Sequence, residues 1–309
     1  MHLKALRYFT RVATTESFVA TARHFGVPPS SVSRHIAALE KELGHQLLFR
    51  HTRAVRLTEA GERYYLQVRD ALDALDAASE GVAGHDAAPR GVVHVNAPVA
   101  LGRLHIAPLL VDFQALYPEL TIELTLTDTF IDPVQEGADL TVRIGKLEDS
   151  GLVARALGEQ RYLACASPGY LAAHGQPARP EELTRHNCLL YRGQHGTQRW
   201  YFRAPGQATA EAHVVTGNLR SNNAETLVAA AVAGQGLVLF PRWLYPLDSV
   251  RSGALVPVLQ DWQASVDPAP VGIHLVQADN RVRSRKVKLL ADYLAERIGQ
   301  PPYWDALAG

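Results

Sequence analysis

Apolar residues recur every three or four positions over the first 43 residues and predict three short helices. The first runs from about Leu3 to Thr14, and the second follows Ser17, a residue type that caps helix starts. Gly26 ends the second helix and Gly44 ends the third. The third helix is expected to bury Val32, Ile36, Leu39 and Leu43. Two helices joined by a tight turn that contains glycine are typical of a helix-turn-helix.

The third helix and the residues after it carry a polar and basic surface. The helix face opposite the apolar stripe consists of Ser30, Ser33, Arg34, Ala37 and Lys41. Small residues with a few long donors suit a helix that lies in the DNA major groove, which is about 12 Å wide. The following turn-forming residues and a "VRL" segment predict a β-hairpin wing. Its arginines are spaced by three and can reach phosphates, namely Arg50, Arg53 and Arg56.

The charge distribution supports a polyanion-binding surface in this part of the chain. The 309 residues have a formal net charge of zero, but residues 1–58 hold nine Lys/Arg against three Asp/Glu, and residues 59–90 three against seven. A basic block ahead of a neutral body predicts a nucleic-acid-binding module attached to a second part. The alternative is a small helical domain with a solvated basic face. The helix-turn-helix and the wing together favour double-stranded DNA.

A long helix is predicted from Glu59 to about Val82. A heptad seam repeats along it, formed by Tyr65, Val68, Leu72, Leu75, Ser79 and Val82. Such a seam favours pairing with a second copy of the chain, and the alternative is a helix packed on its own domain. The sequence "AGHDAAPRG" then breaks the helix as a hinge. Residues 1–58 are therefore predicted to be the DNA-binding domain and residues 59–90 the linker and dimerisation helix.

Strand-like and helix-like segments alternate from residue 91 onward, which predicts an α/β fold with parallel sheets covered by helices. The expected strands are residues 92–97, 121–127, 139–145, 160–167, 187–192, 199–203, 212–217, 236–240 and 270–277. The expected helices are residues 101–117, a segment after Pro168, 223–233 and 281–298.

Two stretches resemble a known family. The sequences of Phe9–Gly26 and Val32–Gly61 are similar to the N-terminal signature of LysR-type transcriptional regulators, and the resemblance covers nearly all of residues 1–61. It implies a winged helix-turn-helix, a dimerising linker helix and a C-terminal effector-sensing part, assembled as homodimers or homotetramers. It also implies two Rossmann-like subdomains resembling periplasmic binding proteins, here 91–162 plus 268–309 and 163–267. The candidate DNA-binding residues are Ser30, Ser31, Ser33, Arg34, His35, Arg50, Arg53 and Arg56.

The start of the third helix departs from the family's commonest pattern. Pro28-Pro29-Ser30-Ser31 stands where many members have Ser/Thr-Gln-Pro-Ala, so their base preference does not carry over. The prolines predict a helix that begins at Pro29 without a side-chain cap, because Pro28 has no side-chain acceptor. The N–H groups of Ser30, Ser31 and Val32 are then expected to face outward, where a DNA phosphate can accept from them.

Three segments are candidates for the effector site, because ligands of open parallel sheets lie beyond strand C-termini and near helix N-termini. They match the family's effector cleft and are Pro98, Val99 and Ala100; Arg143, Ile144 and Gly145; and Ser221, Asn222 and Asn223. Their convergence predicts a small anion such as a carboxylate, or another polar metabolite. The alternatives are a surface ion pair for Arg143 and an ordinary turn and cap for Asn222 and Asn223. Ala100 lacks the hydroxyl that many relatives carry there.

Other functional classes lack a matching motif. The Gly234 and Gly236 pair has Leu239 where a dinucleotide-binding loop needs its third glycine. Cys165 and Cys188 have no metal-binding spacing, so no catalytic residue, metal or cofactor is expected. With no apolar signal-peptide core and no run of eighteen apolar residues, a cytoplasmic protein without membrane contact is expected. The alternative is a cytoplasmic small-molecule binding protein, or an enzyme, with an appended DNA-binding module.

Overall fold

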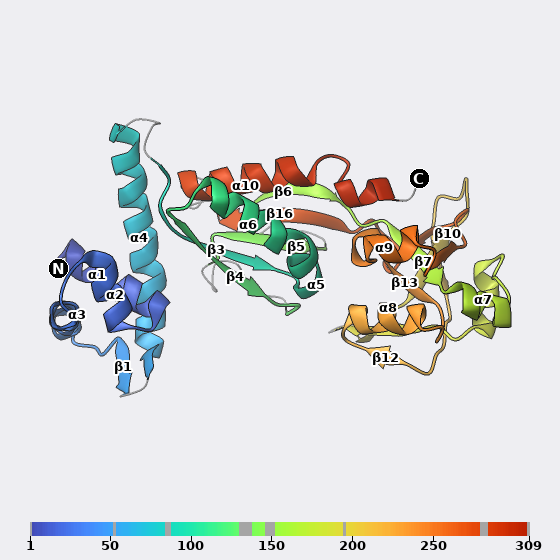
Figure 1. Ribbon diagram of the computed structural model, residues 1–309, viewed down its shortest axis with the longest axis horizontal. Helices are drawn as coiled ribbons and strands as arrows, with labels where there is room; N and C mark the ends of the chain where they lie inside the picture. The colour runs from blue at the N-terminus through green and yellow to red at the C-terminus, as the bar shows by residue number, and fades with distance from the viewer. Residues whose placement is uncertain are drawn as a thin grey trace. The chain divides into compact units, whose positions relative to one another are not determined.

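A computed structural model describes residues 2–51, 54–83, 88–129, 138–145, 152–193, 196–278 and 284–307. The chain divides into two compact units (Figure 1). The first consists of Met1–Ala88 with Arg283–Arg285, and the second of Pro89–Val282 with Lys286–Gly309.

The first unit has the expected order of three helices, a hairpin and a long helix. Its elements are α1 (Leu3–Thr15), α2 (Phe18–Phe25), α3 (Pro29–Leu43), β1 (Leu48–His51), β2 (Ala54–Leu57) and α4 (Glu59–Ala83). Ser17 caps α2 by accepting a hydrogen bond from the N–H of Ala20 at 3.1 Å. Gly26 ends α2 with a φ of 62°, a left-handed conformation that favours glycine.

One apolar core holds the helices and the hairpin of this unit together. Tyr8, Phe9, Val32, Ile36 and Leu48 are buried in it, whereas Leu43 is only partly buried. On α4, the seam residues Val68 and Leu72 are buried within the single chain, and Leu75 is 43% exposed. Part of the seam is therefore packed within the single chain, as the alternative expects, and Leu75 still presents apolar surface.

The second unit begins and ends in the same subdomain, called here the first subdomain. Its elements are β3 (Gly91–Ala97), α5 (Val99–Leu101), the π-helical turn η1 (Gly102–Ile106), α6 (Ala107–Leu116), β4 (Leu120–Leu126), β5 (Leu140–Ile144), β6 (Leu152–Glu159), β16 (Gly272–Ala278), α10 (Arg285–Ile298) and η5 (Tyr303–Leu307). The sheet order is β4-β3-β5-β16-β6, with β3 parallel to β4 and β5, and β16 antiparallel to β5 and β6.

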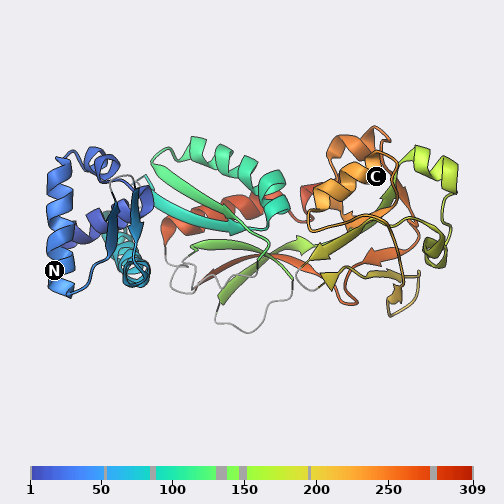
Figure 2. The same ribbon diagram turned by 90° about the horizontal axis from the view of Figure 1, so that it is seen from below.

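Helices α6 and α10 pack on the same side of this sheet (Figures 1 and 2), where the rings of Phe113 and Tyr293 lie 5.2 Å apart. By length and composition alone, the helical stretch Val99–Leu116 could span a membrane, with a mean hydropathy of 1.3. It connects two parallel strands and buries Leu110 and Phe113 in the sheet's core. That packing is typical of a crossover helix in an α/β domain.

The second subdomain lies between β6 and β16 in the chain. Its elements are β7 (Tyr162–Ala166), α7 (Pro168–His174), η2 (Pro180–Arg185), β8 (Leu190–Gly193), β9 (Gly196–Thr197), β10 (Trp200–Arg203), β11 (Glu211–His213), β12 (Arg220–Ser221), α8 (Ala224–Val232), β13 (Val238–Pro241), η3 (Arg242–Leu244), α9 (Leu247–Arg251), β14 (Val256–Val258) and β15 (Gln263–Ser265).

The strand pairing of the second subdomain is more mixed than the alternation of elements predicts. The order β11-β10-β15-β7-β13, with β14 also on β7, is built from antiparallel pairs, whereas β12 and β8 pair in parallel. The strand expected over residues 212–217 ends at His213, and β6 was not expected. The predicted α/β class is nevertheless confirmed.

Candidate DNA-binding face and effector site

The start of α3 is the centre of the candidate DNA-binding face. Pro28 precedes it in an extended conformation (φ −63°, ψ 143°), and among the described residues no side chain caps the helix there. The Ser31 N–H donates to the Pro28 carbonyl at 2.9 Å, because the first turn tightens to an i to i+3 bond. The expectation that this N–H faces outward was therefore wrong. Ser30 is exposed, as the DNA hypothesis requires.

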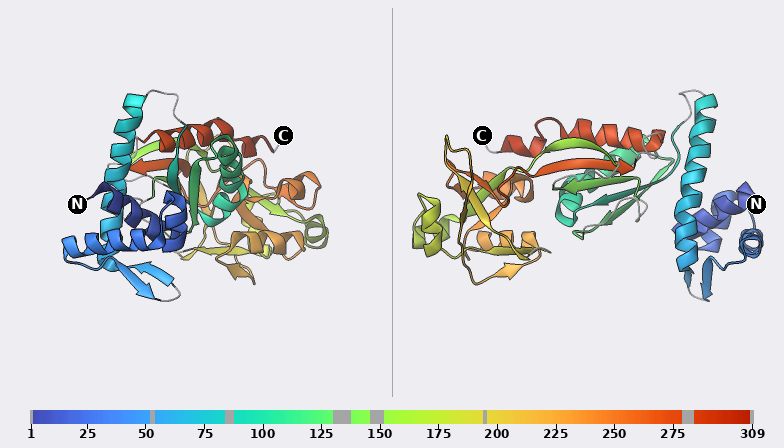
Figure 3. Two further views of the ribbon diagram at one scale, coloured as in Figure 1. Left: turned by 60° about the vertical axis from the view of Figure 1, so that its left-hand side comes forward. Right: turned by 180° about the vertical axis from the view of Figure 1, so that it is seen from behind.

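The outward face of α3 keeps its basic and small residues accessible. Arg34 and Lys41 are exposed, with Ala37 between them, whereas Ser31 and Ser33 are half-buried. Figure 3 shows the β1–β2 hairpin projecting from the helical core next to α3. A helix and a hairpin placed in this way can contact a groove and its flanking backbone together.

His35 differs from the other candidates on α3. Its Nδ1 lies 2.8 Å from the Ser31 carbonyl, and its ring meets Tyr8 edge-on at 5.3 Å. A carbonyl only accepts, so Nδ1 carries the hydrogen in this contact. Nε2 is therefore the ring nitrogen that remains for a contact with DNA.

The wing is fixed to α3 by a residue that the sequence reasoning missed. Glu40 Oε1 accepts from the backbone N–H groups of Leu47 and Leu48, at 2.9 and 3.1 Å. On the hairpin Arg56 is exposed and pairs in register with Phe49. Arg50 belongs to β1, but its side chain lies outside the described residues, as does the whole of Arg53.

The first candidate effector segment lies where β3 meets α5. Pro98 precedes α5, and Ala100 packs against the apolar core. The Val99 N–H donates to Asp128 Oδ1 at 2.9 Å. The backbone donor of Val99 is therefore already bonded to a carboxylate of the protein.

The third segment is likewise bonded within itself. Asn223 accepts through Oδ1 from the N–H and the hydroxyl of Thr226, at 2.8 and 2.9 Å, and so caps α8. The Asn223 N–H donates to Ser221 Oγ at 3.0 Å. These bonds form an ordinary turn and helix cap, which is the alternative interpretation of this segment. Asn222 is exposed.

The second segment lies at the end of β5. Arg143 pairs in register with His274 on β16, and Ile144 packs against the core. Burial lowers the pKa of His274, and the positive charge of Arg143 lowers it further. Gly145 has a φ of 128°, which disfavours any side chain, and its N–H donates to the Gly272 carbonyl at 3.0 Å.

Contacts between the subdomains bring the first and third segments together. Arg103, just after α5, forms an ion pair with Glu225 in the first turn of α8. Burial raises the pKa of Tyr191 on β8, and the negative charge of Asp128 raises it further, so these two residues are also neighbours. Asp128 directly follows the strand expected over residues 121–127, so an acid at a strand end was a signal in the sequence for this site. Among the described residues, no cluster of His, Cys, Asp or Glu could hold a metal ion.

Family models cover both units of the chain. The model described as "Bacterial regulatory helix-turn-helix protein, lysR family" matches residues 3–62, and "LysR substrate binding domain" matches residues 86–299. The chain belongs to the LysR family of transcriptional regulators.

Full-length relatives agree with this membership. The chain is 34% identical over 294 residues to the uncharacterized HTH-type transcriptional regulator YhjC of Escherichia coli strain K12, covering 95% of this chain and 96% of that one. It is 32% identical over 302 residues to the transcriptional activator TtdR of the same strain, covering 96% and 95%. The full-length structure of the Vibrio cholerae virulence activator AphB matches with a TM-score of 0.59 and 29% identity, covering 96% and 99%.

The LysR membership assigns a role to each of the two units. The chain is a DNA-binding transcriptional regulator with an N-terminal helix-turn-helix and an effector-binding domain of two subdomains. The resemblance, the fold class and this function, all predicted from the sequence, are confirmed.

Proposed function

We propose that this regulator binds double-stranded DNA as a homodimer or homotetramer, and that a polar small molecule held between its subdomains changes that binding. The observation that carries the DNA contact is the exposed face of α3 around Arg34, whose helix start has no side-chain cap among the described residues. The proposed contacts are Ser30, Ser31, Ser33, Arg34, His35, Arg50, Arg53 and Arg56.

The proposed effector contacts are Pro98, Val99, Ala100, Arg143, Ile144, Gly145, Ser221, Asn222 and Asn223. The Asp128 carboxylate on the Val99 N–H favours an effector that brings hydrogen-bond donors of its own. A carboxylate effector must displace Asp128 to reach the same N–H. A polar metabolite with donor groups is therefore better supported than a simple carboxylate.

The oligomer is proposed from α4, where Leu75 leaves apolar surface beside the buried Val68 and Leu72. Two-fold pairing places two α3 helices on two half-sites of DNA. We retain the division into residues 1–58, 59–90, 91–162 plus 268–309 and 163–267, and the cytoplasm as the place of action. We propose no catalytic activity, metal or cofactor.

Binding to DNA from the regulator's own promoter region tests this function. We expect an affinity at least about 10³-fold higher than for an unrelated duplex at physiological salt, measured by fluorescence anisotropy. Equal affinity for both duplexes contradicts sequence-specific regulation. A metabolite that raises the melting temperature should be recovered unchanged after prolonged incubation, whereas its conversion would support the enzyme alternative.

A further inference from the structure

The π-helical turn η1 reaches the second subdomain from two sides. Within this five-residue turn, Arg103 pairs with Glu225 of α8, and His105 contacts the carbonyl of Trp243 in η3. Helical residues two apart do not share a face, so the two contacts leave the turn in different directions. Short π-helical turns are rare and occur frequently at functional sites.

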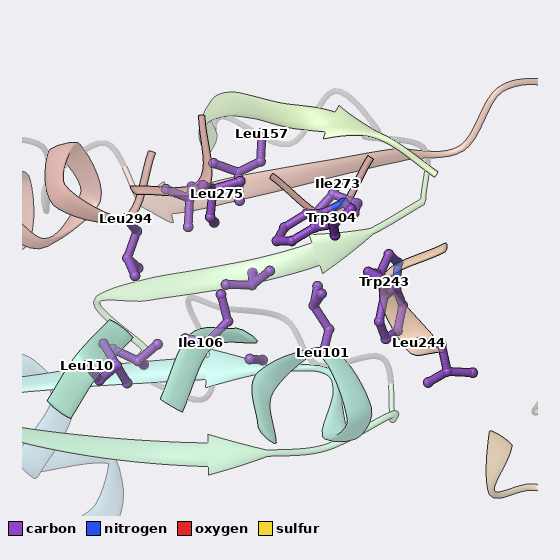
Figure 4. Packing of buried hydrophobic residues seen from close by; sticks show 14 of the residues in the cluster. Leu101, Ile106, Leu110, Leu157, Trp243, Leu244, Ile273, Leu275, Leu294 and Trp304 are labelled. Carbon is purple, nitrogen blue, oxygen red and sulfur yellow. The ribbon is translucent and has the colours of Figure 1, made fainter. Parts of the chain in front are cut away.

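The contact made by His105 is buried and uses both ring nitrogens. Its Nε2 donates to the Trp243 carbonyl at 2.8 Å, and this assignment makes Nδ1 the acceptor for the Tyr303 hydroxyl at 2.6 Å. The rings of Trp304, Tyr303 and Trp243 lie 4.8, 5.6 and 6.1 Å from the imidazole. Figure 4 shows Trp243, Trp304 and Leu101 together at one end of the apolar cluster. The imidazole and its bond to the Trp243 carbonyl are buried, so water does not compete for that bond.

The ion pair made by Arg103 is solvent-accessible and therefore weak. The Arg103 side chain is 55% exposed and that of Glu225 is 30% exposed, so water and salt screen the pair. Each residue of this ion pair lies close in the chain to a proposed effector segment. Arg103 lies three residues after Ala100, and Glu225 lies two residues after the α8 cap Asn223.

We propose that η1 is the joint that sets the angle between the two subdomains, with His105 as its pivot and the Arg103–Glu225 pair as a latch. When the latch is closed, the first turns of α5 and α8 are held near one another. When it opens, the subdomains can rotate about the buried His105 contact. An occupant that moves either helix start thereby shifts the latch equilibrium.

Distances between paired spin labels test the latch in the full-length chain without effector or DNA. Glu119→Cys on the first subdomain and Ala208→Cys on the second are at exposed positions. Native Cys165 and Cys188 are 0% exposed and do not compete for the label. Dilution with unlabelled chain removes distances between subunits. Because the measurement uses neither ligand, its result is independent of the proposed function.

Arg103→Glu should change the ratio of short to long distances by about two- to fivefold, the size of an exposed ion pair. The reciprocal variant Arg103→Glu with Glu225→Arg should restore the original distribution. The control is Arg155→Glu, which breaks the exposed 2.8 Å Arg155–Asp292 pair inside the first subdomain and should leave the distances unchanged. An unchanged distribution in Arg103→Glu, an equal change in Arg155→Glu, or no restoration in the reciprocal variant overturns the proposal.

Discussion

Two helix starts, at α3 and α8, both looked suited to anions in the sequence, yet they are built differently. At α8, Asn223 accepts from Thr226 twice and so closes the helix start with a side chain of the chain itself. At α3, Pro28 supplies only its carbonyl, to Ser31, and the described residues provide no side-chain cap. The difference shows that a helix start binds an external anion only where the protein has not already satisfied its donors.

The contrast extends to the polar groups of each unit. In the second unit, acids near the proposed effector segments are bonded internally, as in Asp128 with Val99 and Glu225 with Arg103. The first unit leaves Arg34 and Arg56 exposed on one helix and one hairpin. We therefore expect the first unit to bind phosphate and the second unit to bind a polar molecule selectively.

The largest expected effect is on the salt dependence of DNA binding. If the dimer neutralises about six phosphates, its affinity should fall about 10³-fold between 50 and 200 mM salt, because released counterions drive binding. Anisotropy titrations over that range measure the slope. Arg56→Ala should make the slope shallower by about one unit for each phosphate that the variant no longer neutralises. A nearly flat dependence would count against the role given to the first unit.

Next in size is the loss of selectivity on removing Arg34. Arg34→Ala should weaken binding to the specific site by about 1–3 kcal/mol and bring it closer to binding of unrelated DNA, because a long donor is lost from the recognition helix. Arg56→Ala is the matched control and should weaken binding to all sequences about equally. Competition with unrelated DNA separates the two patterns, and identical losses in both variants would contradict them.

A similar energy is expected for the buried contact of His105. His105→Leu should lower the free energy of unfolding by about 1–3 kcal/mol at pH 7.5, because the Trp243 carbonyl loses its donor. Burial lowers the pKa of His105 below its ordinary 6.5, so the unfolded chain binds the proton more readily. The wild type's advantage is complete above pH 6.5 and shrinks as the pH falls toward the lowered value. Urea unfolding at pH 7.5 and 5.5 measures both effects.

His105→Gln is the matched control for that prediction. The side-chain amide that this substitution introduces can still donate toward Trp243 but does not titrate. We expect the variant to retain part of the stability at pH 7.5 and to lack the pH-dependent loss. If the wild type and His105→Leu lose stability in parallel between the two pH values, the buried imidazole is not the titrating group.

Sequence reasoning succeeded where local interactions decide the structure. The limits of α2 follow from Ser17 and Gly26, and α3 begins at Pro29, because caps and prolines act within a few residues. It failed where residues far apart in the chain determine the structure. β6 is an exposed edge strand that forms by pairing with β16, more than a hundred residues away in the chain. The antiparallel pairing of β13 with β7 is equally invisible to local periodicity.

The candidate sites follow the same rule. The face of α3 could be predicted from helical spacing alone, since its residues lie on one element. In the effector region, the sequence indicated helix starts but not their partners. The contacts of Asp128 with Val99, of Glu225 with Arg103 and of Tyr191 with Asp128 exist only through the fold. Glu40 was missed for a similar reason, because it accepts from the Leu47 N–H only after the chain has folded back toward α3.

Removing the side-chain cap of α8 tests the comparison at the capped helix. Asn223→Ala should lower the stability of the second unit by about 1 kcal/mol, because two hydrogen bonds to Thr226 are lost. DNA affinity without effector should be unchanged. Thermal unfolding and anisotropy on the same preparation measure both quantities. Unchanged stability would show that Asn223 does not act as a cap.

The smallest expected change in stability belongs to the reverse experiment at α3. Pro28→Ser introduces a side-chain cap, and the net gain should be about 0.5 kcal/mol, because the cap is partly offset by the loss of proline's restriction of the unfolded chain. DNA affinity should fall several-fold even though the protein becomes more stable, since the new hydroxyl competes with phosphate for the N–H groups of the first turn. Unfolding and anisotropy measurements should therefore change in opposite directions. If affinity is unchanged while stability rises, the uncapped start of α3 is only an imperfect helix end, and its difference from α8 has no bearing on DNA binding.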